Sequence, residues 1–137
     1  MPLSGDKLPL QEEPDAPGLT LAVWAEALYL TNLLLLPGIC FAILVWLYFK
    51  HRAAAPALAV CHLKQTVAAS LWAGILLGVV TVIIVALSDY RSEYTWIVVI
   101  CYLVCFHSSL VLLGVLGLAK AMAGQTYVYP LIGRPCA

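Results

Sequence analysis

Three polar side chains stand just before a long uncharged apolar run. They are His62, Lys64 and Gln65. Lysine and histidine at such a boundary typically extend toward lipid headgroups and set the depth of a helix. His62 and Gln65 are also able to hydrogen-bond the C-terminal tail, for example at the hydroxyl of Tyr127 or Tyr129. Metal or proton chemistry by His62 is not favoured, because we expect no carboxylate on the same side of the membrane.

His107 is the most unusual polar residue, because it falls near the middle of an apolar run and is followed by Ser108 and Ser109. A polar side chain at that depth is costly in lipid and by default indicates a function or a partner. The simplest interpretation is a neutral imidazole that hydrogen-bonds another helix. Haem ligation is not favoured, because there is no second histidine at a matching depth to supply the other axial ligand.

Small residues recur every fourth position on two of the apolar runs. The first set is Ser70, Gly74 and Gly78, and the second is Cys101, Cys105 and Ser109, with Gly117 further along. Such stripes let helix backbones approach closely. We expect the two stripes to pack against each other; the alternative is that one of them meets a partner protein or a second copy. Two cysteines alone are too few ligands for a metal site.

No enzyme motif is present in the sequence. It contains no HExxH, GxSxG, phosphate-cradling glycine loop or CxxC. Glu26, Asp89 and Glu93 are all expected on the outer side, away from the polar group at His62. We therefore expect no catalytic residue, no cofactor, no metal and no nucleic-acid partner.

The composition indicates that the chain lies in a hydrophobic environment. Of 137 residues, 64% are hydrophobic and 10% charged, whereas soluble domains carry about 25% charged residues. The chain is predicted to be an all-α integral membrane three-helix bundle, with spans at about 27–49, 66–87 and 95–119. The first apolar run, 19–49, is too long to cross straight, so it either begins with an interfacial turn, which we favour, or kinks at Pro37.

The basic residues predict the orientation of the bundle. Lysines and arginines gather in the loop between the first two spans and in the C-terminal tail: Lys50, Arg52, Lys64, Lys120 and Arg134. The positive-inside rule then places the N-terminus outside and the C-terminus in the cytoplasm. Residues 1–18 are predicted to be a flexible acidic tail, and residues 19–134 a single transmembrane domain.

The five cysteines are Cys40, Cys61, Cys101, Cys105 and Cys136. Their number is odd, and disulfide frameworks belong to small secreted domains with little core. We expect all five to be reduced and to behave as small apolar residues.

Two motifs resemble a bacterial family of small three-span membrane proteins without an assigned function, distantly similar to the small channel subunit of the chloroplast inner-envelope import translocon. The matching residues are His62, Lys64 and Gln65, the Leu36-Pro37-Gly38 break, and in the tail Gly124, Tyr127, Tyr129, Pro130, Leu131 and Gly133. The resemblance covers roughly residues 26–134. Leu63 departs from it, since the family commonly has a small residue there. The resemblance implies the fold and topology, and only by analogy a role in translocation.

These observations favour a non-enzymatic accessory subunit that packs against a larger membrane complex or itself. Its partners would be the lipid bilayer and another membrane complex or a homo-oligomer. A second hypothesis is an oligomeric channel or translocation component lined by His107, Ser108 and Ser109. A third is a redox accessory protein with His62 and His107 as cofactor ligands. The cytoplasmic motif would consist of His62, Lys64, Gln65, Tyr127, Tyr129, Pro130 and Arg134.

Overall fold

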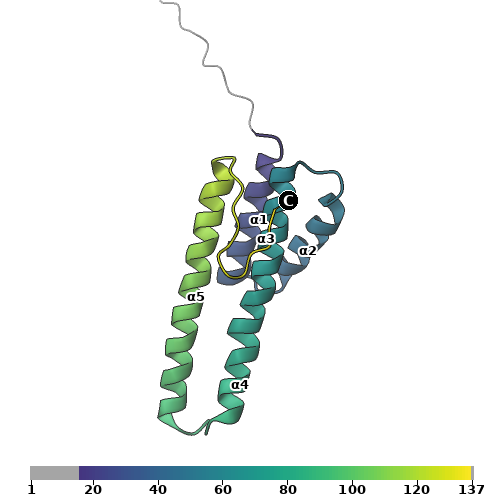
Figure 1. Ribbon diagram of the computed structural model, residues 1–137. Helices are drawn as coiled ribbons and strands as arrows, with labels where there is room; N and C mark the ends of the chain where they lie inside the picture. The colour runs from purple at the N-terminus through teal and green to yellow at the C-terminus, as the bar shows by residue number, and fades with distance from the viewer. Residues whose placement is uncertain (1–15, 137) are drawn as a thin grey trace, which may run out of the picture.

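The computed structural model describes residues 16–136, and every regular element in that part of the chain is helical. The elements are α1 (Leu19–Leu34), α2 (Ile39–His51), α3 (Ala57–Ala73), the π-helical turn η1 (Gly74–Val79), α4 (Val80–Leu87) and α5 (Glu93–Met122). α3, η1 and α4 run on as one helix from Ala57 to Leu87 (Figure 1). Most of the predicted acidic tail lies outside the described residues.

The helices form a wide end and a narrow end (Figure 1). At the wide end α1 packs against α2, α3 and α5, around a core of Ala25, Tyr29, Leu44, Leu63, Ala69 and Tyr129. At the narrow end only α4 and the first half of α5 continue, as an antiparallel pair joined by residues 88–92. The chain therefore has four helices in its thick part and two in its thin part.

The predicted span at 27–49 is wrong, because α1 and α2 form a hairpin. Pro37 lacks a backbone N–H, and Gly38 takes φ +89°, a conformation that side chains rarely tolerate. The chain therefore turns at residues 35–38 instead of kinking. With 16 and 13 residues, the two helices are about 24 and 20 Å long, shorter than a hydrocarbon core of about 30 Å.

Asn32 holds this turn together. Its Oδ1 accepts hydrogen bonds from the backbone N–H groups of Gly38 (2.9 Å) and Phe41 (3.2 Å). The N–H groups of Leu35 and Leu36 both donate to the carbonyl of Thr31. The surface of the turn is apolar, with Leu34, Leu35, Leu36 and Ile39 exposed.

The other two predicted spans lie within longer helices. Residues 66–87 fall inside Ala57–Leu87, and residues 95–119 inside Glu93–Met122. Both helices are long and apolar enough to cross a membrane, by length and composition. The prediction of three spanning helices is therefore replaced by two long apolar helices and a short hairpin.

The two ends of the described chain lie at the same end of the molecule. Ala22 near the start of α1, Leu58 near the start of α3 and Ala121 near the end of α5 form one buried cluster, with Ala16 packed on it. This differs from the prediction that the first apolar run begins on the side opposite the C-terminal tail. The reason is the hairpin, which returns the chain to its starting end before α3 begins.

Candidate functional site

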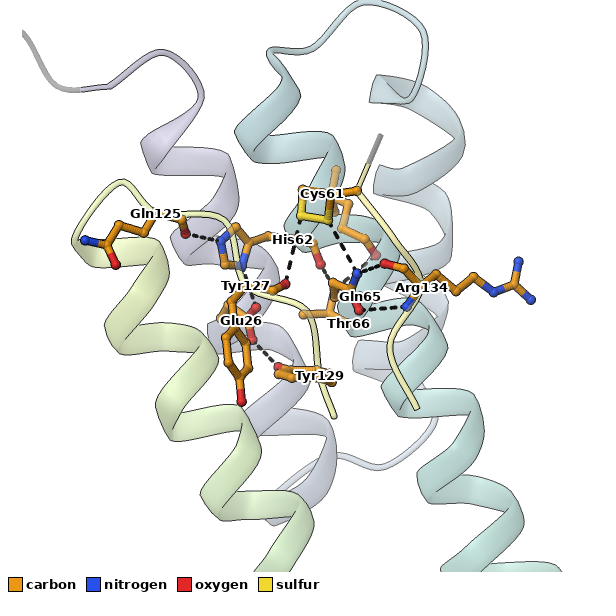
Figure 2. Close-up of polar contacts among 11 residues, drawn as sticks. Glu26, Cys61, His62, Gln65, Thr66, Gln125, Tyr127, Tyr129 and Arg134 are labelled. Carbon is orange, nitrogen blue, oxygen red and sulfur yellow. Dashed lines mark hydrogen bonds and ion pairs between the residues drawn. A yellow bond between two sulfur atoms is a disulfide. The ribbon is translucent and has the colours of Figure 1, made fainter. Parts of the chain in front are cut away.

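The C-terminal tail folds back over the wide end of the bundle. After α5, residues 123–136 descend between α5 and α3 and then return along α3 (Figures 1 and 2). Tyr129 is 1% exposed and belongs to the core of the bundle. Its ring lies 5.7 Å from that of Tyr29 and 5.2 Å from that of Tyr127, centroid to centroid. The tail is thus packed as part of the fold.

A buried glutamate and histidine meet beneath this tail (Figure 2). Oε1 of Glu26 in α1 lies 2.6 Å from Nδ1 of His62 in α3, and both side chains are fully buried. His62 Nε2 lies 2.9 Å from the carbonyl oxygen of Gln125. A carbonyl only accepts, so Nε2 carries a proton. The remaining proton, between Nδ1 and Oε1, makes the pair either imidazolium–carboxylate or imidazole–carboxylic acid.

Tyr129 completes this cluster by donating its hydroxyl hydrogen to Oε2 of Glu26. Burial, together with the nearby charge of Glu26, raises the pKa of Tyr129 well above its ordinary value, so the hydroxyl stays a donor. Gly117 of α5 makes the approach possible. A Cβ at that position would lie 2.6 Å from Glu26 Oε2 and 2.7 Å from the Tyr129 hydroxyl.

Gln65 and Lys64 bind the last residues of the tail. The Gln65 side chain accepts from the backbone N–H of Arg134 (3.1 Å) and donates to the carbonyl of the same residue. Lys64 Nζ donates to the carbonyl of Pro135 at 2.9 Å. The Arg134 side chain itself is exposed and points away from the cluster (Figure 2). Pro130 is exposed in the turn of the tail, where its carbonyl accepts from the N–H of Ile132.

Two of the five cysteines are joined in a disulfide, which contradicts the prediction that all five are reduced. Cys61 of α3 bonds Cys136 in the tail, with their Cα atoms 5.2 Å apart. No signal in the sequence indicates this pairing, because the two residues are 75 positions apart and only the folded tail brings them together. Cys40, Cys101 and Cys105 are free thiols.

These contacts form what we call the tail latch, defined as Glu26, His62, Gln65 and Tyr129. Each of the four is at most 1% exposed, so no substrate in solvent reaches the acid or the base. Both ring nitrogens of His62 are already engaged, which contradicts its assignment as a cofactor ligand. The latch can hold the tail on the bundle and can shift a proton within the Glu26–His62 pair.

Sequence reasoning placed His62 and Gln65 near the tail but missed Glu26. Their contacts to the tail are with backbone groups of Gln125 and Arg134, instead of a tyrosine hydroxyl. The prediction that the first apolar run is a crossing puts Glu26 on the opposite side from His62. The signal that could have identified Glu26 is a single carboxylate inside an apolar run, because such a carboxylate needs a buried partner.

The two small-residue stripes do not pack against each other. Cys101, Cys105 and Ser109 are exposed on α5. A Cβ placed on Gly74 or Gly78 would meet no atom within 4 Å. Of the glycines in the two stripes, only Gly117 is closely packed, against Glu26 of α1 and Tyr129 of the tail. His107 is partly exposed and Ser108 is exposed; His107 makes no side-chain hydrogen bond within residues 16–136.

An apolar groove of about 500 Å³ lies where the hairpin turn meets α3 and η1. Its walls come from Asn32, Pro37, Gly38 and Phe41 on one side and Ser70, Gly74, Ile75 and Gly78 on the other. Ser70 is 5% exposed, and its hydroxyl has no hydrogen-bond partner in the described chain. The first small-residue stripe therefore forms one wall of an open groove.

The comparisons with known proteins found no match of any of the three kinds: no family model, no curated protein and no solved structure. The resemblance to the three-span bacterial family stays a prediction.

Proposed function

We propose that this chain is a small non-enzymatic membrane protein that serves as a packing subunit of a larger membrane assembly. The observation that carries the proposal is how its polar and apolar groups are distributed. The polar groups of the tail latch are sealed inside and satisfied by the chain's own atoms. The helices of the narrow end instead present large exposed apolar side chains, among them Val79, Val82, Ile83, Leu87, Ile97, Val98, Ile100 and Val104.

The hairpin turn supports placement in a membrane. In lipid, a backbone N–H without a partner costs several kcal/mol. In this turn the N–H groups of Leu35, Leu36, Gly38 and Phe41 are all bonded within the chain, while the surrounding side chains are apolar. The hairpin would enter the bilayer from one surface and return to it, beside two helices that cross.

The basic residues give this arrangement an orientation. The wide end carries Lys50, Arg52, Lys64, Lys120 and Arg134, whereas the loop at the narrow end carries only Arg91. By the positive-inside rule the wide end faces the cytoplasm. We propose that both described chain ends lie at the cytoplasmic face of a bacterial inner membrane.

The Cys61–Cys136 disulfide favours the opposite orientation, because such bonds persist in oxidising compartments. We base the orientation on the basic residues, because they direct insertion into the membrane. Whether the neighbouring sulfurs of Cys61 and Cys136 form a disulfide or stay as two thiols depends on the redox conditions of the compartment. In the cytoplasm the pair would be held as thiols.

A second candidate function is an oligomeric channel or translocation component. It is favoured by His107, which has no partner in the described chain, and by the exposed hydroxyls of Ser108 and Ser109. Two crossing helices enclose no pore by themselves, so this function requires several copies that turn these residues toward water.

The two functions are separated by purification from native membranes in mild detergent with a C-terminal affinity tag. Mass spectrometry of the intact assembly and an absorption spectrum would be recorded on one sample. The packing subunit predicts a stoichiometric larger partner. In this case His107→Ala weakens assembly, whereas the control change Met122→Ala, at an exposed position at the wide end of α5, does not.

A colourless homo-oligomer without a partner would contradict the packing subunit and favour the channel. For a channel, His107 reacts with a water-soluble imidazole reagent, and His107→Ala removes conductance while assembly is unchanged. An absorbing cofactor in the sample would contradict both functions.

A further inference from the structure

The groove beside η1 and the exposed stripe on α5 are complementary in residue size. One wall of the groove carries Gly74 and Gly78, which leave open space. The stripe carries Cys101 and Cys105, both exposed. Small residues on facing helices allow backbones to approach and pack closely in lipid. Within one chain these two surfaces do not meet.

The two surfaces also lie at the same depth. The hydroxyl of Tyr102 in α5 donates to the carbonyl of Leu76 in η1 at 2.6 Å, so the two residues lie at similar depths, within the length of the tyrosine side chain. Counting outward along the antiparallel helices pairs Ser70 with Ser109, Gly74 with Cys105 and Gly78 with Cys101, each to within about the same length. Copies inserted in the same orientation share these depths.

The groove contains a polar group that lacks a partner. The Ser70 hydroxyl is buried, lines the groove and makes no hydrogen bond within the described chain. Buried polar atoms are almost always bonded, so an unpaired one indicates a missing partner. Ser109, at the matching depth, donates to the carbonyl of Cys105, and its oxygen keeps lone pairs that accept a hydrogen bond.

We propose that the groove receives α5 of a second copy of this chain, with the Ser70 hydroxyl donating to Ser109 of that copy. The inference deepens the packing function and rests on the membrane placement proposed above. A crossing angle of about 40°, usual for small-residue contacts, carries the rest of the docked helix away from the hairpin. Each copy has one groove and one stripe, so the contact can repeat in a closed assembly.

Engineered cysteines in the full-length protein, oxidised in native membrane vesicles, test this contact. The first variant is Gly78→Cys with Cys105→Ser, which leaves Cys101 as the stripe thiol. The second is Gly74→Cys with Cys101→Ser, which leaves Cys105. Because docking raises the effective concentration of the paired thiols, we expect covalent dimer at least about tenfold above the control.

The control is Val82→Cys with Cys105→Ser, since Val82 is 67% exposed on α4 and lies outside the groove. Dimer in both test variants and not in the control supports the proposal. Equal dimer in the control, no dimer in the test variants, or dimer between α5 thiols of the unsubstituted chain would overturn it.

A second measurement tests the contact if the cysteine variants fold poorly. Ser70→Ala removes only a hydroxyl, and we expect it to weaken self-association about threefold, the value of one interhelical hydrogen bond in lipid. Ser108→Ala, one residue from the stripe, should have no effect. A chain that is single in native membranes, or a groove filled by a co-purified lipid, would overturn the second copy. A larger partner bound to only one copy would overturn it as well and leave the packing function standing.

Discussion

Glu26 is the residue on which the tail latch depends most, because its two carboxylate oxygens serve two different elements. Oε1 meets His62 of α3, and Oε2 accepts from Tyr129 of the tail. A buried ion pair adds little net stability compared with a well-packed apolar pair, but removing one of its members is costly. We therefore interpret Glu26 as the connection between α1, α3 and the tail.

Glu26→Gln tests this interpretation. The amide keeps the shape of the side chain but loses the charge that strengthens both hydrogen bonds. We expect the free energy of unfolding in detergent to fall by at least about 2 kcal/mol. Glu93→Gln, at an exposed position in the first turn of α5, is the matched control and should change little. Equal losses in the two variants would contradict the role of Glu26.

Tyr129→Phe tests the hydroxyl alone. It leaves Oε2 of Glu26 buried without its donor, and we expect a loss of about 1–3 kcal/mol. Tyr127→Phe is the matched control, because the Tyr127 hydroxyl makes no hydrogen bond to residues 16–136. A loss as large in Tyr127→Phe would mean that the effect comes from ring packing and not from the latch.

The buried hydroxyl of Tyr129 also predicts how the stability of the protein depends on pH. The pKa of Tyr129 is raised in the folded protein from an ordinary value of 10.0, so the unfolded chain ionises first. The stabilisation is complete below pH 10.0 and is lost as the pH rises above it. Tyr129→Phe should therefore lose less stability above that pH than the unsubstituted protein, as measured by unfolding at a series of alkaline pH values.

The disulfide gives a prediction that holds for either orientation. In the purified oxidised protein, reductant should lower the free energy of unfolding by about 2–4 kcal/mol, because the crosslink closes a long loop. Cys136→Ser should be equally less stable and insensitive to reductant. Cys101→Ser, at an exposed free thiol, should behave as the unsubstituted chain. Full reactivity of Cys61 and Cys136 toward alkylation without reductant would contradict the bond.

At the scale of elements, the sequence predicted the long helices well and the first apolar run poorly. Uncharged apolar runs longer than 20 residues strongly favour a helix, so the sequence predicts helices at 66–87 and 95–119. Pro37 and Gly38 indicate a break in the first helix, but a kink and a reversal of the chain direction have the same local sequence pattern. Only the contacts of Asn32 and of Glu26 with distant residues decide between them, and these cannot be read from spacing.

Asn32→Ala tests how the hairpin is held. The change leaves the N–H groups of Gly38 and Phe41 without their acceptor, and we expect a loss of about 2–4 kcal/mol from two unpaired groups. Thr31→Val is the matched control, because the Thr31 hydroxyl donates only to the Ala27 carbonyl of its own helix. If both variants unfold alike, the turn is held by packing and not by the asparagine.

The small-residue stripes show a second limit of sequence reasoning. Spacing of four marks Gly74, Gly78, Cys101 and Cys105 as helix faces built of small residues. It does not say which faces meet, because α5 turns Cys101, Cys105 and Ser109 outward while Leu110, Gly114 and Gly117 face the bundle. Faces left open in one chain are the ones that we assign to contacts between chains.

At the scale of the whole molecule, the hairpin determines the topology. Because α1 and α2 return the chain to its starting end, two long apolar helices follow and both described ends lie together at the wide end (Figure 1). The disulfide and the tail latch are then at one end of the molecule, and the loop at residues 88–92 is at the other; in the proposed membrane placement these ends face opposite sides. This arrangement is the central claim about the molecule.

The most direct test is to locate both ends of the chain and the loop at residues 88–92 in one set of membranes. Reporters active only in the cytoplasm or only outside it would be fused at each end and inserted in the loop. We predict that both ends report the cytoplasm and the loop reports the outside. Ends on opposite sides of the membrane would require a third crossing and would contradict the hairpin.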